Sequence, residues 1–317
     1  MDVAARVVPW TWLAVAPLAL AWALALGCAS DGGDGSPSTP RGALEVVTSF
    51  YPLQYVVDRV GGDRVRVTNL TPPGSEPHDV ELTPDDVAGL NEADLVVYLA
   101  GFSPAVDDAV TAEAGDRALE VGQFADLDLT FTPIEEGALA GDEKGVDPHF
   151  WLDPVRLADV ADQVALRLGA DDPDGAKTFA ANAAALRQDL EALDAELAAG
   201  LKDCENRSIV TSHNAFGYLA DRFGLTQVGI TGLTPDEEPT PADLAAVTRF
   251  VRENDVQTIY YETLVSPAVA KTVAAETGAA IAVLDPIEGL SDASAGSDYL
   301  AVMRANLASL RAGQPCR

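Results

Sequence analysis

The sequence contains only three histidines in 317 residues, so the position of each one carries weight. His78 and His213 each follow a strand-like apolar run, and His149 lies at the end of a proline-bounded loop before a helical pattern. Asp285 follows a further strand-like run and precedes a proline. Neutral imidazole and carboxylate groups are ligands of borderline divalent metals. Three nitrogens with one carboxylate would form a closed, four-coordinate metal site.

Each of these residues also has an ordinary structural interpretation. A single histidine in a loop is usually solvated or hydrogen-bonded, and Asp285 in front of Pro286 is suited to starting a turn. Glu262, which follows the run 258–261, is a competing strand-end carboxylate, and it could instead orient a ligand without touching the metal. Placement alone therefore leaves the metal site and the ordinary interpretation both open.

Strand-like apolar runs alternate with helical patterns along the chain, which predicts an α/β fold with parallel sheets. The predicted strands are 45–49, 64–70, 94–99 and 117–121 in the first half, and 208–211, 226–229, 258–261 and 280–284 in the second. Ligands of open parallel sheets bind beyond the carboxyl ends of the strands. Because two histidines belong to the first half and the third belongs with Asp285 to the second, the pattern predicts a site in a cleft between two lobes.

One long helical pattern separates the two halves. Apolar residues, mostly leucines, recur every three or four positions from residue 173 to residue 201. A helix of that length extends about 43 Å at 1.5 Å per residue. We therefore expect a first β/α lobe at 44–170, a long rigid linker helix at 171–203 that limits hinge motion, and a second β/α lobe at 204–317.

The amino-terminal segment resembles a bacterial lipoprotein signal. Residues 7–27 carry no charge and are mostly apolar, and Cys28 follows directly. We expect residues 1–27 to be a signal peptide, Cys28 to carry the lipid, and residues 28–43 to be a flexible tether. An uncleaved membrane anchor is the alternative. Both interpretations place most of the chain outside the cytoplasmic membrane, anchored to its outer face.

The two remaining cysteines, Cys204 and Cys316, would then lie in an oxidising compartment, where disulfides persist. Cys204 precedes a strand-like run, and Cys316 is the penultimate residue. We expect a disulfide that fixes the carboxy terminus to the second lobe. Two unpaired, partly buried thiols are the alternative.

The charge of the chain argues against one class of partner. The sequence has 20 Lys and Arg against 50 Asp and Glu, a formal net charge of −30. Proteins that bind nucleic acid neutralise phosphates with clustered basic side chains. We therefore expect no nucleic-acid partner, whereas the same charge attracts divalent cations.

A series of short motifs extends over nearly all of the chain after the amino-terminal segment. They are SFYP at 49–52, VGGD at 60–63, PPGSEPH at 72–78, LNEADL at 90–95, DPHFWLDP at 147–154, TSHNAF at 211–216 and YETL at 261–264. In this order they resemble the metal-binding lipoproteins that deliver zinc or manganese to ABC importers, the cluster A-I solute-binding family. The single motifs are weak signals, and their combination is highly specific.

This resemblance implies two β/α lobes joined by a rigid helix, with the metal in the cleft between them. It places the family's ligands on His78, His149, His213 and Asp285. Manganese-type members usually carry a carboxylate where this sequence has His213, so the resemblance favours Zn2+ over Mn2+. The implied function is that of a non-catalytic, extracytoplasmic zinc-binding lipoprotein, a monomer that passes its ion to an ABC-type permease in the membrane.

Three alternatives accompany this interpretation. A manganese-specific protein is the alternative within the family. A zinc hydrolase with three histidines and an open position for water, or a metal-independent surface adhesin, would belong to a different class.

Many zinc members carry a His-rich tract before the second histidine, but the corresponding stretch 135–144 keeps acidic residues and has no histidine. We therefore expect no second zinc site there.

Overall fold

The computed structural model describes residues 42–131 and 145–317. The predicted signal peptide, Cys28 and the acidic stretch 135–144 lie outside these residues, as does the predicted tether up to residue 41. Within the described part of the chain, no helix combines the length and the apolar character needed to cross a membrane.

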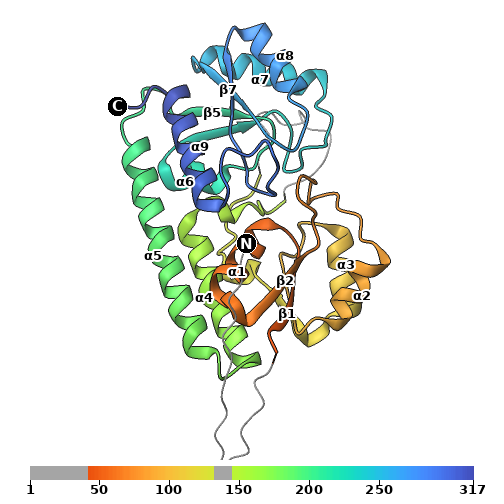
Figure 1. Cartoon of the computed structure of the whole chain (residues 1–317). Coiled ribbons are helices and arrows are strands. Elements are labelled where there is room, and N and C mark those ends of the chain that lie inside the picture. Colours follow the sequence, from red (N-terminus) through yellow and green to blue (C-terminus); the bar gives the residue numbers. More distant parts are fainter. Residues whose placement is uncertain (1–41, 132–144) are drawn as a thin grey trace, which may run out of the picture. The chain divides into compact units, whose positions relative to one another are not determined.

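The first half of the chain forms a sheet of four parallel strands in the order β2-β1-β3-β4 (Figure 1). The strands are β1 (Leu44–Thr48), β2 (Val65–Asn69), β3 (Leu95–Tyr98) and β4 (Ala118–Glu120). The helices are α1 (Tyr51–Gly61), α2 (Pro84–Glu92), α3 (Pro104–Glu113) and α4 (Pro154–Asp171), with 3-10 turns at Gly62–Arg64, Gly115–Arg117, Gly122–Phe124 and Phe150–Leu152. Each of the four α-helices has a proline in its first turn, where the missing N–H costs nothing. Valine-rich runs suit buried parallel strands.

The second half repeats this topology in a sheet with the order β6-β5-β7-β8. The strands are β5 (Ser208–Thr211), β6 (Thr226–Gly229), β7 (Thr258–Tyr261) and β8 (Ala280–Val283). The helices are α6 (Gly217–Phe223), α7 (Pro241–Glu253), α8 (Ala268–Thr277) and α9 (Tyr299–Gly313). Each predicted strand begins and ends within one residue of an observed one, and the two parallel sheets confirm the α/β class. The residue limits predicted for the two lobes stay predictions.

One long helix, α5 (Ala176–Leu201), connects the two halves. It starts at Ala176 rather than at residue 173 as predicted, because the chain first makes a turn in which the Gly175 amide donates to the Asp172 carbonyl. A β-carbon on Gly175 would lie 2.6 Å from the Asp172 carboxylate and 2.7 Å from the Phe179 ring, so a larger residue would force these side chains to move. The leucines of α5 are buried, and the helix packs against α1, α4 and α9 (Figure 1).

Buried hydrogen bonds join the two halves beside α5. The Trp151 indole N–H donates to the Pro286 carbonyl at 2.7 Å, and the Tyr299 hydroxyl donates to the Trp151 carbonyl at 2.5 Å. Arg222 of α6 pairs with Asp153, the residue that caps α4, at 3.3 Å. These contacts fix loops of the first half against loops and helices of the second.

Cys204 and Cys316 form a disulfide, which confirms the predicted pairing. The two residues are 112 positions apart and also pair as an isolated antiparallel bridge. Because α9 ends at Gly313, the disulfide fixes the carboxy-terminal segment to the segment that leads into β5.

Loss of this disulfide should lower the free energy of unfolding by about 2–5 kcal/mol, because the bond closes a long loop in the unfolded chain. Urea denaturation of the oxidised and the reduced protein measures the difference. The double variant Cys204→Ser/Cys316→Ser is the control, since reductant should leave its denaturation midpoint unchanged. Equal midpoints for the oxidised and the fully reduced protein would contradict this expectation.

Candidate metal centre

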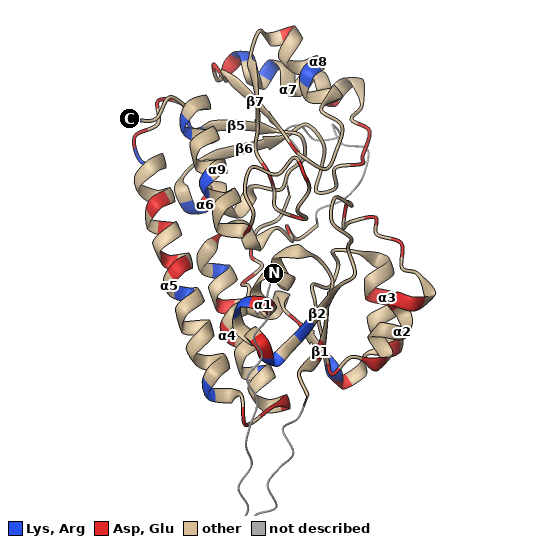
Figure 2. Ribbon diagram, viewed as in Figure 1, with Lys and Arg blue, Asp and Glu red and all other residues tan. Residues whose placement is uncertain are grey.

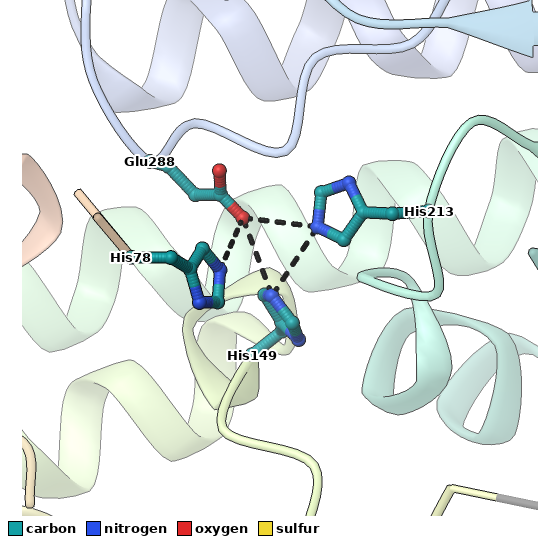
Figure 3. A group of neighbouring side chains, drawn as sticks. All are labelled: His78, His149, His213 and Glu288. Atoms are coloured by element: carbon teal, nitrogen blue, oxygen red, sulfur yellow. Dashed lines mark hydrogen bonds and ion pairs between the residues drawn. The ribbon is translucent and has the colours of Figure 1, made fainter. Parts of the chain in front are cut away.

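Four side chains from four loops meet in one buried cluster (Figure 3). His78 lies in the loop between β2 and α2, and His149 directly precedes the 3-10 turn before α4. His213 lies two positions after the end of β5, and Glu288 lies in the loop between β8 and α9. One potential ligand atom from each residue lies within 4.8 Å of the other three. The structure therefore brings the three predicted histidines together, and it adds a glutamate.

Four of the distances between donor atoms of this cluster are close to those of a tetrahedral metal site. His213 Nε2 lies 3.4 Å from His149 Nε2 and 3.2 Å from Glu288 Oε1. The same glutamate oxygen lies 3.2 Å from His149 Nε2 and 3.5 Å from His78 Nε2. Ligands about 2.0–2.1 Å from a tetrahedral zinc ion are separated from one another by about 3.3–3.4 Å. The cluster is thus arranged as donors around a small cation.

Two carboxylates outside the cluster orient two of the histidines. Asp147 Oδ1 accepts a hydrogen bond from the backbone N–H of His149 at 2.9 Å and lies 2.8 Å from its Nδ1. Glu262 Oε1 accepts from the backbone N–H of His213 at 3.1 Å and lies 2.7 Å from its Nδ1. A carboxylate at Nδ1 keeps a proton on that nitrogen and leaves Nε2 free to bind a metal. Glu262 therefore lies behind a histidine rather than within the cluster.

The cluster is closed off from solvent. His149, His213 and Glu288 are fully buried, and His78 is 5% exposed with its ring centroid 4.2 Å from that of Phe102. Among the described residues, His78 Nε2 is buried without a hydrogen-bond partner, although it faces Glu288 Oε1 at 3.5 Å. Burial of a polar nitrogen without a partner is costly. A bound cation would supply that partner, so the site fits a metal ion.

Neighbouring carboxylates control the protonation of two histidines. Burial by itself lowers the pKa of His213, but the negative charges of Glu262 and Glu288 outweigh burial and raise this pKa well above its ordinary value of 6.5. Burial likewise disfavours the charged form of His149. Hydrogen bonds to Asp147 and Glu288 nevertheless raise its pKa above 6.5. The metal-free site therefore holds protons on imidazoles at a pH where free histidine is neutral.

The pKa values of two buried glutamates near the site are shifted in opposite directions. Burial disfavours the charged form of Glu288, yet the charge of His213 and hydrogen bonds from the cluster hold its pKa well below its ordinary value. Burial and the nearby charge of Glu288 raise the pKa of Glu76, two positions before His78, to about 9. Burial is also the main reason why the pKa of His78 is lowered. The charged carboxylate that faces the three histidines is thus that of Glu288, while Glu76 is neutral near pH 7.

Asp285, the carboxylate ligand expected from the sequence, does not lie in the cluster. Its buried carboxylate accepts hydrogen bonds from two hydroxyl groups and one backbone amide instead. Glu288, three positions further along, supplies the carboxylate that faces the histidines. The carboxyl end of β8 thus leads into the loop that carries the fourth donor, and the structure places Glu288 rather than Asp285 beside the histidines. The sequence signal for this donor is a second acidic residue in the same loop, three positions after Asp285.

Two parallel α/β lobes and a buried group of three imidazoles and one carboxylate define a class of binding protein suited to a single small cation. The model of the family described as zinc-uptake complex component A, periplasmic, matches residues 46–313. The chain belongs to this family.

Named relatives and a solved structure agree with this assignment. The chain is 39% identical over 280 residues to the zinc-binding lipoprotein AdcA of Streptococcus pneumoniae, which covers 85% of this chain and 56% of that protein. It therefore spans little more than half the length of the AdcA relatives it matches. It is 33% identical over 308 residues to the high-affinity zinc uptake system protein ZnuA of Bacillus subtilis, covering 95% of this chain and 97% of that one. The Zn(II)-bound ZnuA-like domain of S. pneumoniae AdcA superposes with a TM-score of 0.71 at 35% identity, covering 86% and 99% of the two chains.

Metal binding should release protons well above pH 6.5, because the raised pKa values of His149 and His213 leave protons that the ion must displace. The affinity for Zn2+ should therefore fall as the pH decreases and keep rising as the pH increases beyond 6.5. Calorimetric titration of the metal-free protein in buffers of different ionisation enthalpy counts the released protons. An affinity that stays level between about pH 6 and pH 8 would contradict this prediction.

Proposed function

We propose that this protein is the extracytoplasmic zinc-binding component of an ABC-type importer, which captures Zn2+ and delivers it to a membrane permease. The observation that carries the proposal is the donor cluster itself. Three imidazole nitrogens and one carboxylate oxygen lie buried together within 4.8 Å of one another, and four of the distances between them, 3.2 to 3.5 Å, are close to those of a tetrahedral zinc site. The proposed ligands are His78, His149, His213 and Glu288.

The donor set supports zinc in preference to manganese. Mn2+ suits oxygen ligands in octahedral geometry, whereas Zn2+ accepts four ligands and binds imidazole well. This site offers three nitrogens to one carboxylate. Two relatives of the chain are named for zinc binding or zinc uptake, and a solved structure of a domain of one of them, S. pneumoniae AdcA, is Zn(II)-bound.

The same geometry supports binding rather than catalysis. A catalytic zinc usually has three protein ligands and keeps one position for water. Here Glu288 supplies a fourth donor, and it is fully buried together with His149 and His213. Four protein donors would close the coordination sphere and leave no position at which to activate water. The protein would therefore hold and release its ion without chemical change.

The proposed function includes a location at the cell membrane and an ABC permease as partner. Cys28 would carry a lipid that anchors the chain, as a monomer, to the outer face of the cell membrane. The AdcA relative is named a lipoprotein, and the disulfide suits an oxidising compartment. Acidic residues are distributed over α2, α3 and α5 (Figure 2), and the negative charge of the chain favours the approach of divalent cations. The ABC permease would then receive the ion from the site.

Replacement of a proposed ligand should weaken Zn2+ binding strongly. Loss of a group that only orients a ligand lowers metal affinity by roughly 10–100-fold. His213→Ala should lower the Zn2+ affinity by more than this, because it removes a donor atom. Competition of Zn2+ and Mn2+ against a chelator on metal-stripped protein measures this, and the wild type should prefer Zn2+. Glu253→Ala, at an exposed carboxylate of α7, is the control and should bind as the wild type does. Unchanged Zn2+ affinity in His213→Ala would overturn the proposed function.

A further inference from the structure

The backbone that delivers Glu288 to the cluster has an unusual conformation. Ile287, the residue before it, has a φ of 59°, in the left-handed region. A β-branched residue rarely adopts this region, because its side chain crowds the backbone. Ile287 is fully buried, so hydrogen bonds to solvent do not explain this backbone conformation. Its branched side chain also lacks the conformational freedom of glycine. Surrounding contacts must therefore hold the backbone in this conformation.

Asp285 supplies contacts of the required kind. Its Oδ1 accepts a hydrogen bond from the backbone N–H of Ile287 at 2.8 Å, which closes the turn across Pro286. Its Oδ2 accepts from the hydroxyl of Thr263 at 3.1 Å and from the hydroxyl of Ser294 at 3.1 Å. Both carboxylate oxygens are thus engaged by protein donors, and the side chain is only 2% exposed.

The backbone on both sides of the turn is fixed as well. Asn306 of α9 accepts from the Asp285 amide at 2.9 Å and donates to the Asp285 carbonyl at 2.7 Å. The Leu290 carbonyl accepts from the Gly74 amide of the first lobe at 2.9 Å. Between these two fixed points the chain passes through Ile287 and Glu288. The bond from the Asp285 carboxylate to Ile287 is therefore positioned to set the direction in which the Glu288 side chain points.

We propose that Asp285 is a positioning residue for metal binding: its carboxylate holds the strained turn at Ile287 and thereby aims Glu288 at the three histidines. The inference rests on the proposed function, because it assigns a role within the same zinc site. Asp285 also contacts the segment that orients His213. It accepts a hydrogen bond from Thr263, which directly follows Glu262, the carboxylate at His213 Nδ1. Asp285 thus acts on the metal through Glu288.

The test compares substitutions of Asp285 by Zn2+ competition against a chelator, with thermal unfolding recorded for each metal-free variant. Asp285→Ala should lower Zn2+ affinity by about 10–100-fold, as expected for a group behind a ligand. Asp285→Asn keeps an acceptor for the Ile287 amide, so it should retain most of the affinity. A carboxylate that binds zinc directly would not be replaced by an amide in this way.

A matched control separates positioning from general stability. Asp243 is an equally buried aspartate of the second lobe, 3% exposed, which caps α7 and is not part of the metal cluster. Asp243→Ala should destabilise the metal-free protein but leave Zn2+ affinity unchanged. A loss of affinity in Asp243→Ala as large as that in Asp285→Ala would overturn the inference.

The decisive comparison uses the Glu288→Ala background. There Asp285→Ala should cause no further loss of Zn2+ affinity, because the group that Asp285 positions is already absent. A full additional loss in that background would show that Asp285 acts independently of Glu288. An Asp285→Asn variant that binds as weakly as Asp285→Ala would show that the acceptor for the Ile287 amide is not what sustains zinc binding. A wild-type protein that fails to bind Zn2+ would refute the proposed function itself, whereas these outcomes refute only the role of Asp285.

Discussion

The structure depends on one electrostatic constraint: a charged carboxylate and three imidazoles are buried together within a few ångströms of one another. Glu288 is fully buried, and in the metal-free protein the charge of His213 and hydrogen bonds from the three histidines keep its carboxylate ionised. Such an arrangement is costly unless a cation completes it. The carboxylates behind His149 and His213 strengthen the constraint, because they fix both rings with Nε2 turned inward.

The fold brings loops from both sheets together around this buried cluster. Two parallel sheets of the same topology present their loops to a shared buried region, with the Trp151 and Tyr299 hydrogen bonds beside it. Helix α5 packs along α1 and α4 on one side and along α9 on the other. This framework opposes a wide hinge motion between the lobes. Under the proposed function, movement of the ligand-bearing loops would be the route by which the ion enters and leaves the site.

Much of this organisation could be predicted from the sequence, because it follows from local patterns. Buried parallel strands appear as continuous apolar runs, and the three histidines were identified by their scarcity and by their positions near strand ends. Helix α5 starts three residues later than the sequence predicts, because Pro173 suits a first helical position but is followed by the turn at Gly175. The choice between Asp285 and Glu288 was beyond local reasoning. It depends on a positive φ at Ile287, against the preference of isoleucine, and on donors from distant segments.

The most direct test of the central claim is a crystal structure of the Zn2+-loaded protein, with anomalous scattering measured on both sides of the zinc absorption edge. The account predicts one fully occupied zinc ion bound by Nε2 of three histidines and by Glu288, with the Asp285 carboxylate still bonded to the Ile287 amide. A zinc ion bound by Asp285 in place of Glu288, or one held away from the three histidines, would contradict it.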